Sequence, residues 1–364
     1  MSRFLIKLFV LLALLGLFGA AGCGGGGLPA RQAGGPQEQG QEQAREQVPA
    51  PPGSSRTAEP GIGTGKTKGP DPRPFVHQFM RCRLLEPFGQ QAYAMLTERG
   101  KQAFINGSDP TLGGTPVRQR MTGYRLEDIV EGQNSWTATV SVWLSGPAEK
   151  AESVFYREKL SIIHRGEGFA VDGWEPGSPS RAYAVQRGTT LCVKDAVGKE
   201  SVAATTAQIP VPFAPQGDDP QQKITSAGEF KCIALFSGGR AAFVTLGLFG
   251  STVGVAGGGQ DLQVLARYDS PVVNELVWAP GGRLLAVEGQ LPSGKTDIVI
   301  YDVKTSRQLY ALSEIVPEKG SNLTRGCWLA DDRYFYFFSA AAAKGPQQLW
   351  MLDLESGRVQ PARI

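Results

Sequence analysis

Between residues 74 and 176 the spacing of apolar residues changes from a helical period to a period of two. The first part predicts helices, which begin after the prolines of Asp71-Pro72-Arg73-Pro74, residues suited to a first helical turn. A break at Pro87 and Gly89 separates two apolar groups. The residues at helical spacing are Phe75, Val76, Phe79, Met80 and Leu84 before the break, and Tyr93, Leu96, Ala103 and Phe104 after it.

From Arg120 onward the pattern predicts strands. Apolar and polar residues alternate over 136–144, which indicates a strand with one apolar face. Residues 153–164 predict a second long strand, 165–168 a hairpin turn and 169–174 the returning strand. Helices followed by an antiparallel sheet are typical of an α+β domain.

The second half of the chain repeats a strand-turn-strand unit. The unit at 277–287 recurs at 326–336, and a later strand at 297–303 recurs at 348–354. Arg283 and Arg333 are therefore 50 positions apart, and Asp302 and Asp353 are 51 apart. Fainter copies occur at 233–240, with a later strand at 262–265, and at 191–195. A repeat of this length with four short strands predicts the blades of a β-propeller.

Residues 182–364 are thus expected to form an all-β, propeller-like domain. The turns Pro280-Gly281-Gly282-Arg283 and Asp331-Asp332-Arg333 resemble those of TolB-type blades. Three blades and a fragment leave two alternatives. One is a ring of about four blades whose first blade, 182–211, is degenerate. The other is an open arc, whose exposed edges must be covered by the first domain or by a partner.

Residues 71–178 also resemble a known family. The residues that carry the resemblance are Phe79, Arg83, Ala92, Leu96-Thr97, Gly100 and Phe104, followed by the run from Gly168 to Trp174. They resemble nuclear transport factor 2-like domains. The resemblance implies an α+β domain in which a curved sheet wraps around helices to form a cone. Many close relatives in bacterial envelope lipoproteins lack any known enzyme activity, so the resemblance favours a fold more than a function.

The N-terminus carries the features of a secretion signal. Arg3 and Lys7 precede an apolar run, Leu8 to Phe18, which is shorter than the roughly 20 residues that a membrane-spanning helix needs. Ala20-Ala21-Gly22-Cys23 follows and resembles the lipobox of bacterial lipoproteins. The resemblance implies removal of the signal peptide 1–22, acylation of the Cys23 thiol with palmitate-type chains, and a lipid anchor on the extracytoplasmic face of the cell membrane. The alternative is an ordinary secretory signal with Cys23 incidental.

Residues 23–70 are expected to be a disordered tether, because Gly, Pro, Gln and Glu dominate and few large apolar side chains are present. The segment Gly61–Thr67 ends like a phosphate-binding loop. However, Pro60 occupies the place of the first glycine that the pattern requires, and no strand or helix pattern flanks it. We therefore expect no nucleotide site there.

The charge balance and the cysteine spacing argue against two further kinds of function, nucleic-acid binding and metal binding. The chain has 37 basic and 34 acidic residues, a near balance that argues against nucleic-acid binding. It has no Cys-x-x-Cys pair and no Cys/His cluster, so we expect no metal site and no cofactor. We expect Cys82, Cys192, Cys232 and Cys327 to be free thiols, mostly in apolar strands. A Cys192–Cys232 disulfide is the alternative.

The sequence contains few residues in patterns that are typical of catalytic sites. His77 and His164 are isolated, and no Gly-x-Ser-x-Gly motif is present. Neighbouring carboxylates point to opposite faces of a strand, which disfavours acid–base work by Glu127-Asp128. Two other carboxylate pairs are expected in solvated turns and loops, Asp331-Asp332 and Asp218-Asp219. A turn between blade strands is expected at Ser237-Gly238-Gly239.

Aromatic residues are expected mainly in the cores. Trp278, Trp328 and Trp350 follow the repeat and are predicted to pack between blades. The aromatic residues of the first domain would form its core or, alternatively, line a ligand pocket. They are Trp136, Trp143, Phe155, Tyr156, Phe169 and Trp174.

These patterns together predict a non-enzymatic lipoprotein of the cell envelope. Its propeller-like part would act as a protein-interaction module for an envelope protein, because propellers present loops on a rigid scaffold. The alternative is small-molecule binding or a minor enzymatic role in the cone-shaped domain. A third possibility is an accessory role in envelope assembly or sporulation. No residue in the chain favours or excludes that role.

Overall fold

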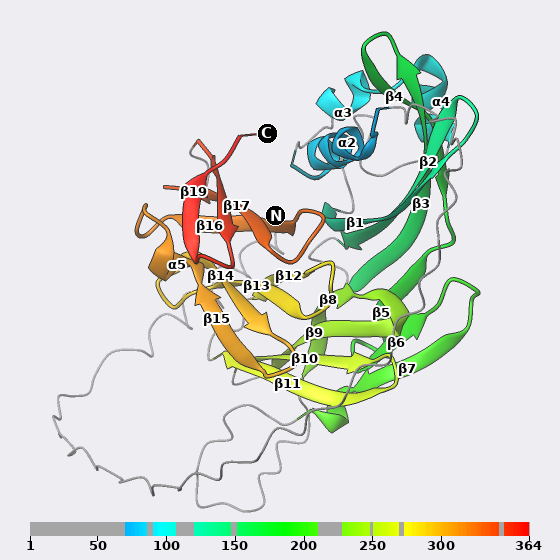
Figure 1. Ribbon diagram of the computed structural model, residues 1–364. Coiled ribbons are helices and arrows are strands. Elements are labelled where there is room, and N and C mark those ends of the chain that lie inside the picture. The colour runs from blue at the N-terminus through cyan, green and yellow to red at the C-terminus, as the bar shows by residue number, and fades with distance from the viewer. Residues whose placement is uncertain are drawn as a thin grey trace, which may run out of the picture. The chain divides into compact units, whose positions relative to one another are not determined.

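The computed structural model describes residues 70–85, 90–106, 120–146, 151–209, 228–247, 250–268, 273–341 and 346–363 (Figure 1). These residues belong to one compact unit, Thr67–Ile364. The predicted signal peptide, Cys23, the tether up to residue 69, the Gly61–Thr67 segment and Asp218-Asp219 lie outside the described residues. None of the described helices is long and apolar enough to cross a membrane.

The unit begins with helices, as the apolar spacing predicts. The helices are α2 (Arg73–Leu85), α3 (Gln90–Ala94) and α4 (Glu98–Asn106). The second helical stretch is interrupted because Leu96 forms a parallel bridge with Val171. The Val171 amide donates to the Met95 carbonyl at 3.1 Å, and the Thr97 amide donates to the Val171 carbonyl at 3.0 Å. This long-range pairing uses backbone groups that a continuous helix would need for itself.

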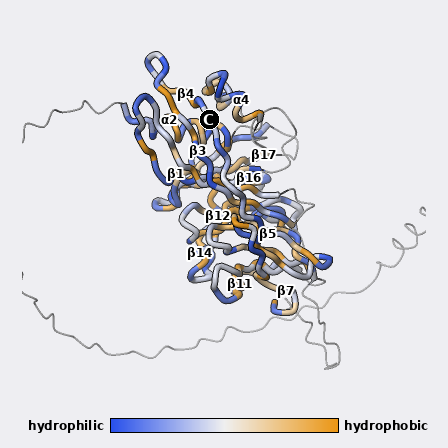
Figure 2. Tube along the Cα trace, turned by 90° about the vertical axis from the view of Figure 1, so that its right-hand side faces the viewer, coloured by the Kyte–Doolittle hydropathy of each residue, from blue (hydrophilic) through white to orange (hydrophobic). Residues whose placement is uncertain are grey.

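Four antiparallel strands follow: β1 (Arg120–Glu131), β2 (Ser135–Ser145), β3 (Glu152–Arg165) and β4 (Gly168–Pro176). One face of this sheet packs against the helices around Phe79, Leu160 and Val171, all fully buried. The other face carries Trp143 and Phe155, which are paired across β2 and β3 and belong to a separate core. In Figure 2 hydrophobic positions run along the strands, whereas the hairpin tips beside β4 and β7 are hydrophilic.

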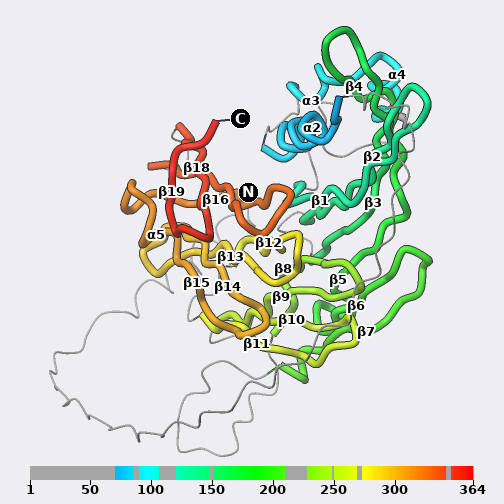
Figure 3. Tube along the Cα trace, viewed as in Figure 1, coloured from blue at the N-terminus to red at the C-terminus, as the bar shows by residue number. Residues whose placement is uncertain are grey.

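The remaining strands form consecutive antiparallel meanders, the arrangement of propeller blades (Figure 3). The second blade is β8 (Glu229–Leu235), β9 (Arg240–Gly247), β10 (Gly250–Gly257) and β11 (Gln260–Tyr268). The third is β12 (Val273–Trp278), β13 (Leu284–Gln290), β14 (Thr296–Asp302) and β15 (Arg307–Ala311), followed by the short helix α5 (Leu312–Ile315). The fourth is β16 (Asn322–Trp328), β17 (Tyr334–Ala340), β18 (Gln348–Asp353) and β19 (Arg358–Pro361).

Equivalent residues of the repeat make equivalent ion pairs. Arg283 Nε lies 2.7 Å from Asp302 Oδ2 in the third blade, and Arg333 lies 3.2 Å from Asp353 Oδ2 in the fourth. Each pair links the turn before the second strand to the end of the third strand. The repeat spacing of Arg and Asp therefore reflects a contact inside each blade.

The repeated tryptophans join neighbouring blades. Trp278 Nε1 donates to the Ala234 carbonyl of the second blade at 2.9 Å, and Trp328 Nε1 donates to the Val277 carbonyl of the third at 3.3 Å. Both indoles are fully buried, and Trp350 is 6% exposed in the same core as Trp328. The prediction that these three tryptophans are core residues of the blades is confirmed.

The first blade has three strands in the described residues, β5 (Ser180–Val185), β6 (Thr190–Lys194) and β7 (Glu200–Thr205), before a short turn of helix, η1 (Thr206–Gln208). Its inner strand β5 pairs with β3, and the inner strand β16 of the fourth blade pairs in parallel with β1 at Gly123 and Trp328. Strands β1–β3 therefore connect the first and last blades within one sheet. The sheet crosses the expected boundary near residue 180, and the first domain covers inner edges that an open arc would expose.

Candidate functional site

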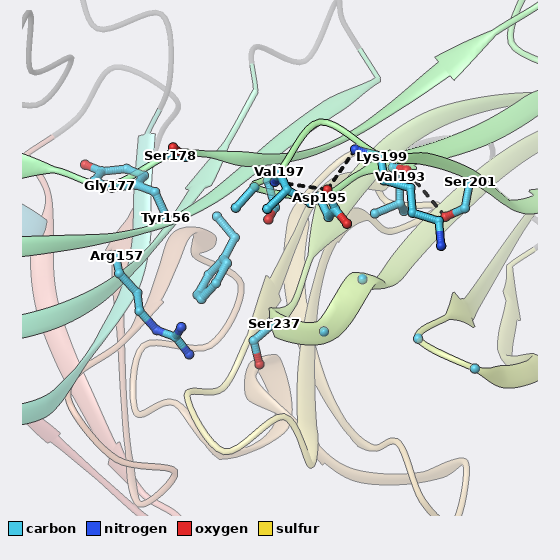
Figure 4. A pocket seen from close by; sticks show the side chains of 17 residues that line it. Tyr156, Arg157, Gly177, Ser178, Val193, Asp195, Val197, Lys199, Ser201 and Ser237 are labelled. Carbon is cyan, nitrogen blue, oxygen red and sulfur yellow. Dashed lines mark hydrogen bonds between the residues drawn. The ribbon is translucent and has the colours of Figure 1, made fainter.

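A cleft of about 700 Å³ opens where the first two blades meet β3 (Figure 4). One wall comes from β3 and the connection to β5, the second from the β6–β7 hairpin, and the third from two glycine turns of the second blade. The lining residues that matter below are Phe155, Arg157, Gly177, Ser178, Val193, Asp195, Val197, Lys199, Ser201, Ser237, Gly238 and Gly259. The cleft thus exists only because the first domain and the blades pack together.

The β6–β7 hairpin is held by Asp195. Its Oδ1 accepts hydrogen bonds from the backbone amides of Val197 at 3.0 Å and Lys199 at 2.8 Å. Two charge-assisted hydrogen bonds to one carboxylate fix the turn and occupy this anionic group. The turn projects Val197, which is 88% exposed, at its tip.

Two glycine turns of the second blade form one wall of the cleft. Gly238 has a φ of +74° and Gly259 a φ of +77°, which favours glycine over any other residue. A Cβ atom at either position would meet no atom within 4 Å, so these positions need glycine for conformation and not for space. The turn predicted at Ser237-Gly238-Gly239 is present as η2 (Ser237–Gly239), and it lines the cleft.

Two cations face the cleft. The exposed Arg157 side chain reaches from β3 toward Ser237, and Lys199 lies on the hairpin at the opposite wall (Figure 4). Neither side chain forms an ion pair with another described residue. Gly177 permits the close approach beside Arg157, since a Cβ there would lie 2.4 Å from the Arg157 carbonyl oxygen.

The cleft is lined by groups of several chemical kinds. Among the described residues that line it, Asp195 is the sole carboxylate, and no histidine or cysteine is present. The cleft also carries the cations Arg157 and Lys199, and hydroxyl groups from Tyr156 and four serines. Charged, hydroxyl and apolar groups together can hold a ligand through several kinds of contact.

The two histidines lie elsewhere. His77 on α2 has its Nδ1 3.1 Å from the Tyr124 hydroxyl, and burial lowers the pKa of His77. His164 on β3 packs edge-on against the Phe169 ring, with 5.5 Å between ring centroids. Both therefore have packing roles, and neither lines the cleft.

The carboxylates considered from the sequence also have structural partners. Glu127 Oε1 accepts from Ser141 and from Arg125, each at 2.7 Å. Partial burial opposes ionisation of Glu127, but these two hydrogen bonds outweigh it and lower its pKa. Asp128 accepts from the adjacent Ile129 amide at 2.8 Å. Both residues are exposed on β1 and do not form an acid–base pair inside the helix-covered face.

Asp331 and Asp332 stabilise turns. Asp331 Oδ1 accepts from the Arg333 amide at 3.0 Å within its own turn. Asp332 Oδ1 accepts from the Gly281 amide at 2.6 Å and so ties the equivalent turns of the third and fourth blades together. These aspartates are therefore part of the scaffold.

The aromatic residues of the first domain do not gather around one pocket. Tyr156 and Trp174 are buried on the helix-covered face, whereas Trp143 and Phe155 point to the blades. Trp174 Nε1 donates to Glu158 Oε2 at 2.8 Å, and Glu158 pairs with Arg83 of α2. This buried ion pair was not predicted from the sequence. Glu158 stands between Tyr156 and Leu160 among the alternate apolar residues of β3 that face the helices, and this is the signal that would have indicated the pair.

The four cysteines of the described unit are thiols, and the alternative Cys192–Cys232 disulfide is not formed. Burial raises the pKa of Cys232 and of Cys327 to about 12. Thiols with such a pKa are poor nucleophiles at neutral pH. In the described ranges no group of three or more His, Cys, Asp or Glu side chains is arranged to hold a metal ion.

The close approach of two carboxylates, Glu275 and Glu288, was also not predicted from the sequence. They lie directly opposite each other on β12 and β13. Glu288 Oε2 accepts from the Arg325 amide at 2.8 Å, while Glu275 is paired with Arg120. Burial, followed by the negative charge of Glu275, raises the pKa of Glu288 from 4.5 to about 7.

This shift predicts pH-dependent stability. A carboxyl group whose pKa is higher in the folded state contributes stability fully below pH 4.5, and that contribution is lost as the pH rises through 7. Glu288→Gln keeps an acceptor for Arg325 and removes the buried charge. We expect it to be about 2–3 kcal/mol more stable than wild type at pH 8 and nearly equal at pH 4.5. Urea unfolding across this range measures the difference, with the exposed Glu314→Gln as control. A pH-independent gap would contradict the assignment.

Comparisons with known proteins give weak likenesses. No protein-family model matches the chain, and no curated protein matches it. TolB from Acinetobacter baumannii aligns with a TM-score of 0.32 and 11% identity, over 68% of this chain and 69% of that one. A chain of the nidogen/laminin complex aligns with a TM-score of 0.33 and 11% identity, over 67% and 80%. The β-propeller domain of the Trilobed protease from Pyrococcus furiosus gives 0.26 and 12%, over 66% and 57%. The propeller-like fold itself is defined by the strand pairings above.

Proposed function

We propose that this protein is a non-enzymatic lipoprotein, anchored through Cys23 on the extracytoplasmic face of the cell membrane, which binds another envelope protein. The observation that carries the binding role is the cleft beside the first blade. Its walls belong to elements joined in continuous or closely packed sheets, so its shape is set before a partner arrives. Preorganised sites lose less entropy on binding, which favours recognition.

Within this proposal, residues 71–178 are a nuclear transport factor 2-like domain. Support comes from α2 and α4, which pack on one face of the antiparallel sheet β1–β4. The interior of this domain holds Arg83 and Glu158, whose charged groups bind each other and have no exposed surface. An interior occupied in this way favours a structural role for the domain over the alternative of small-molecule binding or catalysis.

The anchor is tested by metabolic labelling with a fatty acid. Wild-type protein is expected to take up the label and to stay in the membrane fraction. Cys23→Ala is expected to lose both, because the thiol is the atom that accepts the diacylglyceryl group. Cys192→Ala is the matched control and should behave like wild type. A Cys23→Ala protein that is still labelled and still membrane-bound would overturn the anchor.

The binding role is tested by blocking the cleft. Ser201 is exposed and lines the cleft, so Ser201→Trp should fill it without disturbing a core. Chemical cross-linking in intact cells is expected to capture a defined partner with wild type and not with Ser201→Trp. Ser356→Trp, on an exposed turn of the fourth blade, is the control and should capture as wild type does. Equal capture by both variants would exclude the cleft as the binding site.

A further inference from the structure

We propose that the junction between the first domain and the fourth blade is a latch, which is closed at acidic pH and opens locally as the pH rises toward 8. The latch consists of Arg120 of β1, Glu275 of β12, Glu288 of β13, and Arg325 and Gly326 of β16. It is a conformational device of the fold and depends on neither the anchor nor the cleft. Three features support it: a narrow connection between two strands, an unpaired buried carboxyl group and an unusual backbone conformation.

The connection between β1 and β16 is narrow (Figure 1). The two strands pair at a single position, where Gly123 lies beside Trp328. The Arg120 guanidinium adds a hydrogen bond to the Gly326 carbonyl at 2.7 Å. By contrast, β1 pairs with β2 from Arg120 to Glu131. Segments that few backbone hydrogen bonds hold can open without unfolding of the whole protein.

The junction holds two carboxyl groups, of which one has a cationic partner. Glu275 and Glu288 lie directly opposite each other on β12 and β13. Glu275 is paired with Arg120 and also accepts from the Ser145 hydroxyl at 2.7 Å. Glu288 is 9% exposed and accepts from the Arg325 backbone amide at 2.8 Å. Ionised Glu288 would therefore add a negative charge beside Glu275 without an ion pair of its own.

The other groups around Glu288 do not pair with it. The Arg325 guanidinium lies over the Phe338 ring, 5.3 Å from its centroid, and forms no ion pair within the described part of the chain. The Cys327 thiol of β16 is buried, and burial raises its pKa to about 12, so it is neutral at physiological pH. On the far side, β14 places the apolar Ile298 opposite Glu288.

These surroundings set the direction of the switch. Burial, followed by the charge of Glu275, raises the pKa of Glu288 from 4.5 to about 7, although Arg120 and Arg325 act in the opposite direction. Opening of the latch returns Glu288 to water and to its ordinary pKa of 4.5. Because the pKa is higher in the closed form, that form is favoured fully below pH 4.5 and loses this advantage as the pH rises through 7.

The backbone of β16 shows where the latch opens. Arg325 has a φ of +58°, a left-handed conformation that is uncommon for any residue other than glycine. It lies in a bulge, where the register between β16 and β17 shifts. Such a conformation persists only where surrounding contacts hold it. Here the hydrogen bonds from the Arg325 amide to Glu288 and from Arg120 to Gly326 hold it.

Native-state hydrogen exchange of the full-length protein measures the opening, because the Arg325 amide is protected by its bond to Glu288. After correction for intrinsic exchange rates, we expect the open fraction at this amide to be roughly 50- to 100-fold larger at pH 8 than at pH 5. Low concentrations of urea should leave this opening unchanged, because a local opening exposes little surface. The amides of the buried strand β9 report global unfolding and should respond to urea.

Glu288→Gln keeps an acceptor for the Arg325 amide and removes the ionisable group, so its opening should be equal at pH 5 and pH 8. Glu314→Gln, at an exposed position, is the matched control and should keep the pH dependence of wild type. Equal opening of the wild-type Arg325 amide at both pH values would overturn the proposal. So would opening that follows urea as the β9 amides do, since the junction would then open only when the whole unit unfolds.

Discussion

Replacing Arg120 with methionine is expected to lower the free energy of unfolding by about 3–5 kcal/mol, because the change leaves the Glu275 carboxylate, whose side chain is 15% exposed, without its cationic partner. Arg120 Nε lies 3.0 Å from Glu275 Oε1, and its guanidinium also donates to the Gly326 carbonyl at 2.7 Å. Ser145 Oγ donates to the same carboxylate at 2.7 Å. One side chain of β1 thus connects the third and fourth blades to the first domain.

The loss of stability should come from the unpaired negative charge of Glu275. The double variant Arg120→Met/Glu275→Gln removes that charge and should recover much of the stability, as expected for coupled neighbours. Arg181→Met removes a surface ion pair with Glu152 and should change stability by about 0–1 kcal/mol. Urea unfolding of the three variants measures these differences. If the single and double variants were equally unstable, the carboxylate would not be the cause.

A loss of about 3–5 kcal/mol is also expected for Arg83→Met. Arg83 and Glu158 have fully buried side chains, and Trp174 Nε1 donates to the glutamate at 2.8 Å. The guanidinium also lies over the Phe104 ring, 5.4 Å from its centroid. Methionine fills part of the space but removes the positive charge that pairs with Glu158 at this buried position.

The double variant Arg83→Met/Glu158→Gln separates two causes of this loss. It removes the unpaired charge and keeps an acceptor for Trp174 Nε1, so the double variant should recover much of the stability that Arg83→Met loses. Arg99→Met, whose side chain is 82% exposed, is the control and should stay within about 1 kcal/mol of wild type. A double variant as unstable as Arg83→Met would show that packing around Arg83, and not the stranded charge, dominates.

The sequence alone determined the local structure of the described unit. Alternation over 136–144 predicted β2, and the apolar spacing at Phe75, Phe79 and Met80 predicted α2. The repeat predicted the blade strands, the turn at Ser237-Gly238-Gly239 and the buried tryptophans. These features follow from side-chain periodicity and turn chemistry, which depend on residues a few positions apart.

Only the tertiary structure decided how those elements meet. The helical pattern through Leu96 was interrupted by a bridge to Val171, and β1 was placed beside β16, which no local pattern indicates. Arg120 and Gly326 are separated by 206 positions in the chain, yet they are hydrogen-bonded.

The same reason explains why the residues of the cleft were not predicted to lie together. Arg157 is one exposed residue of a long strand in the sequence, and Lys199 is one residue of a hairpin turn. Their common cleft arises from the packing of three segments, which the periodicity of each segment does not encode. Periodicity reports which face of a strand is buried, whereas the choice of partner for that face is made by packing and chain closure over the whole unit.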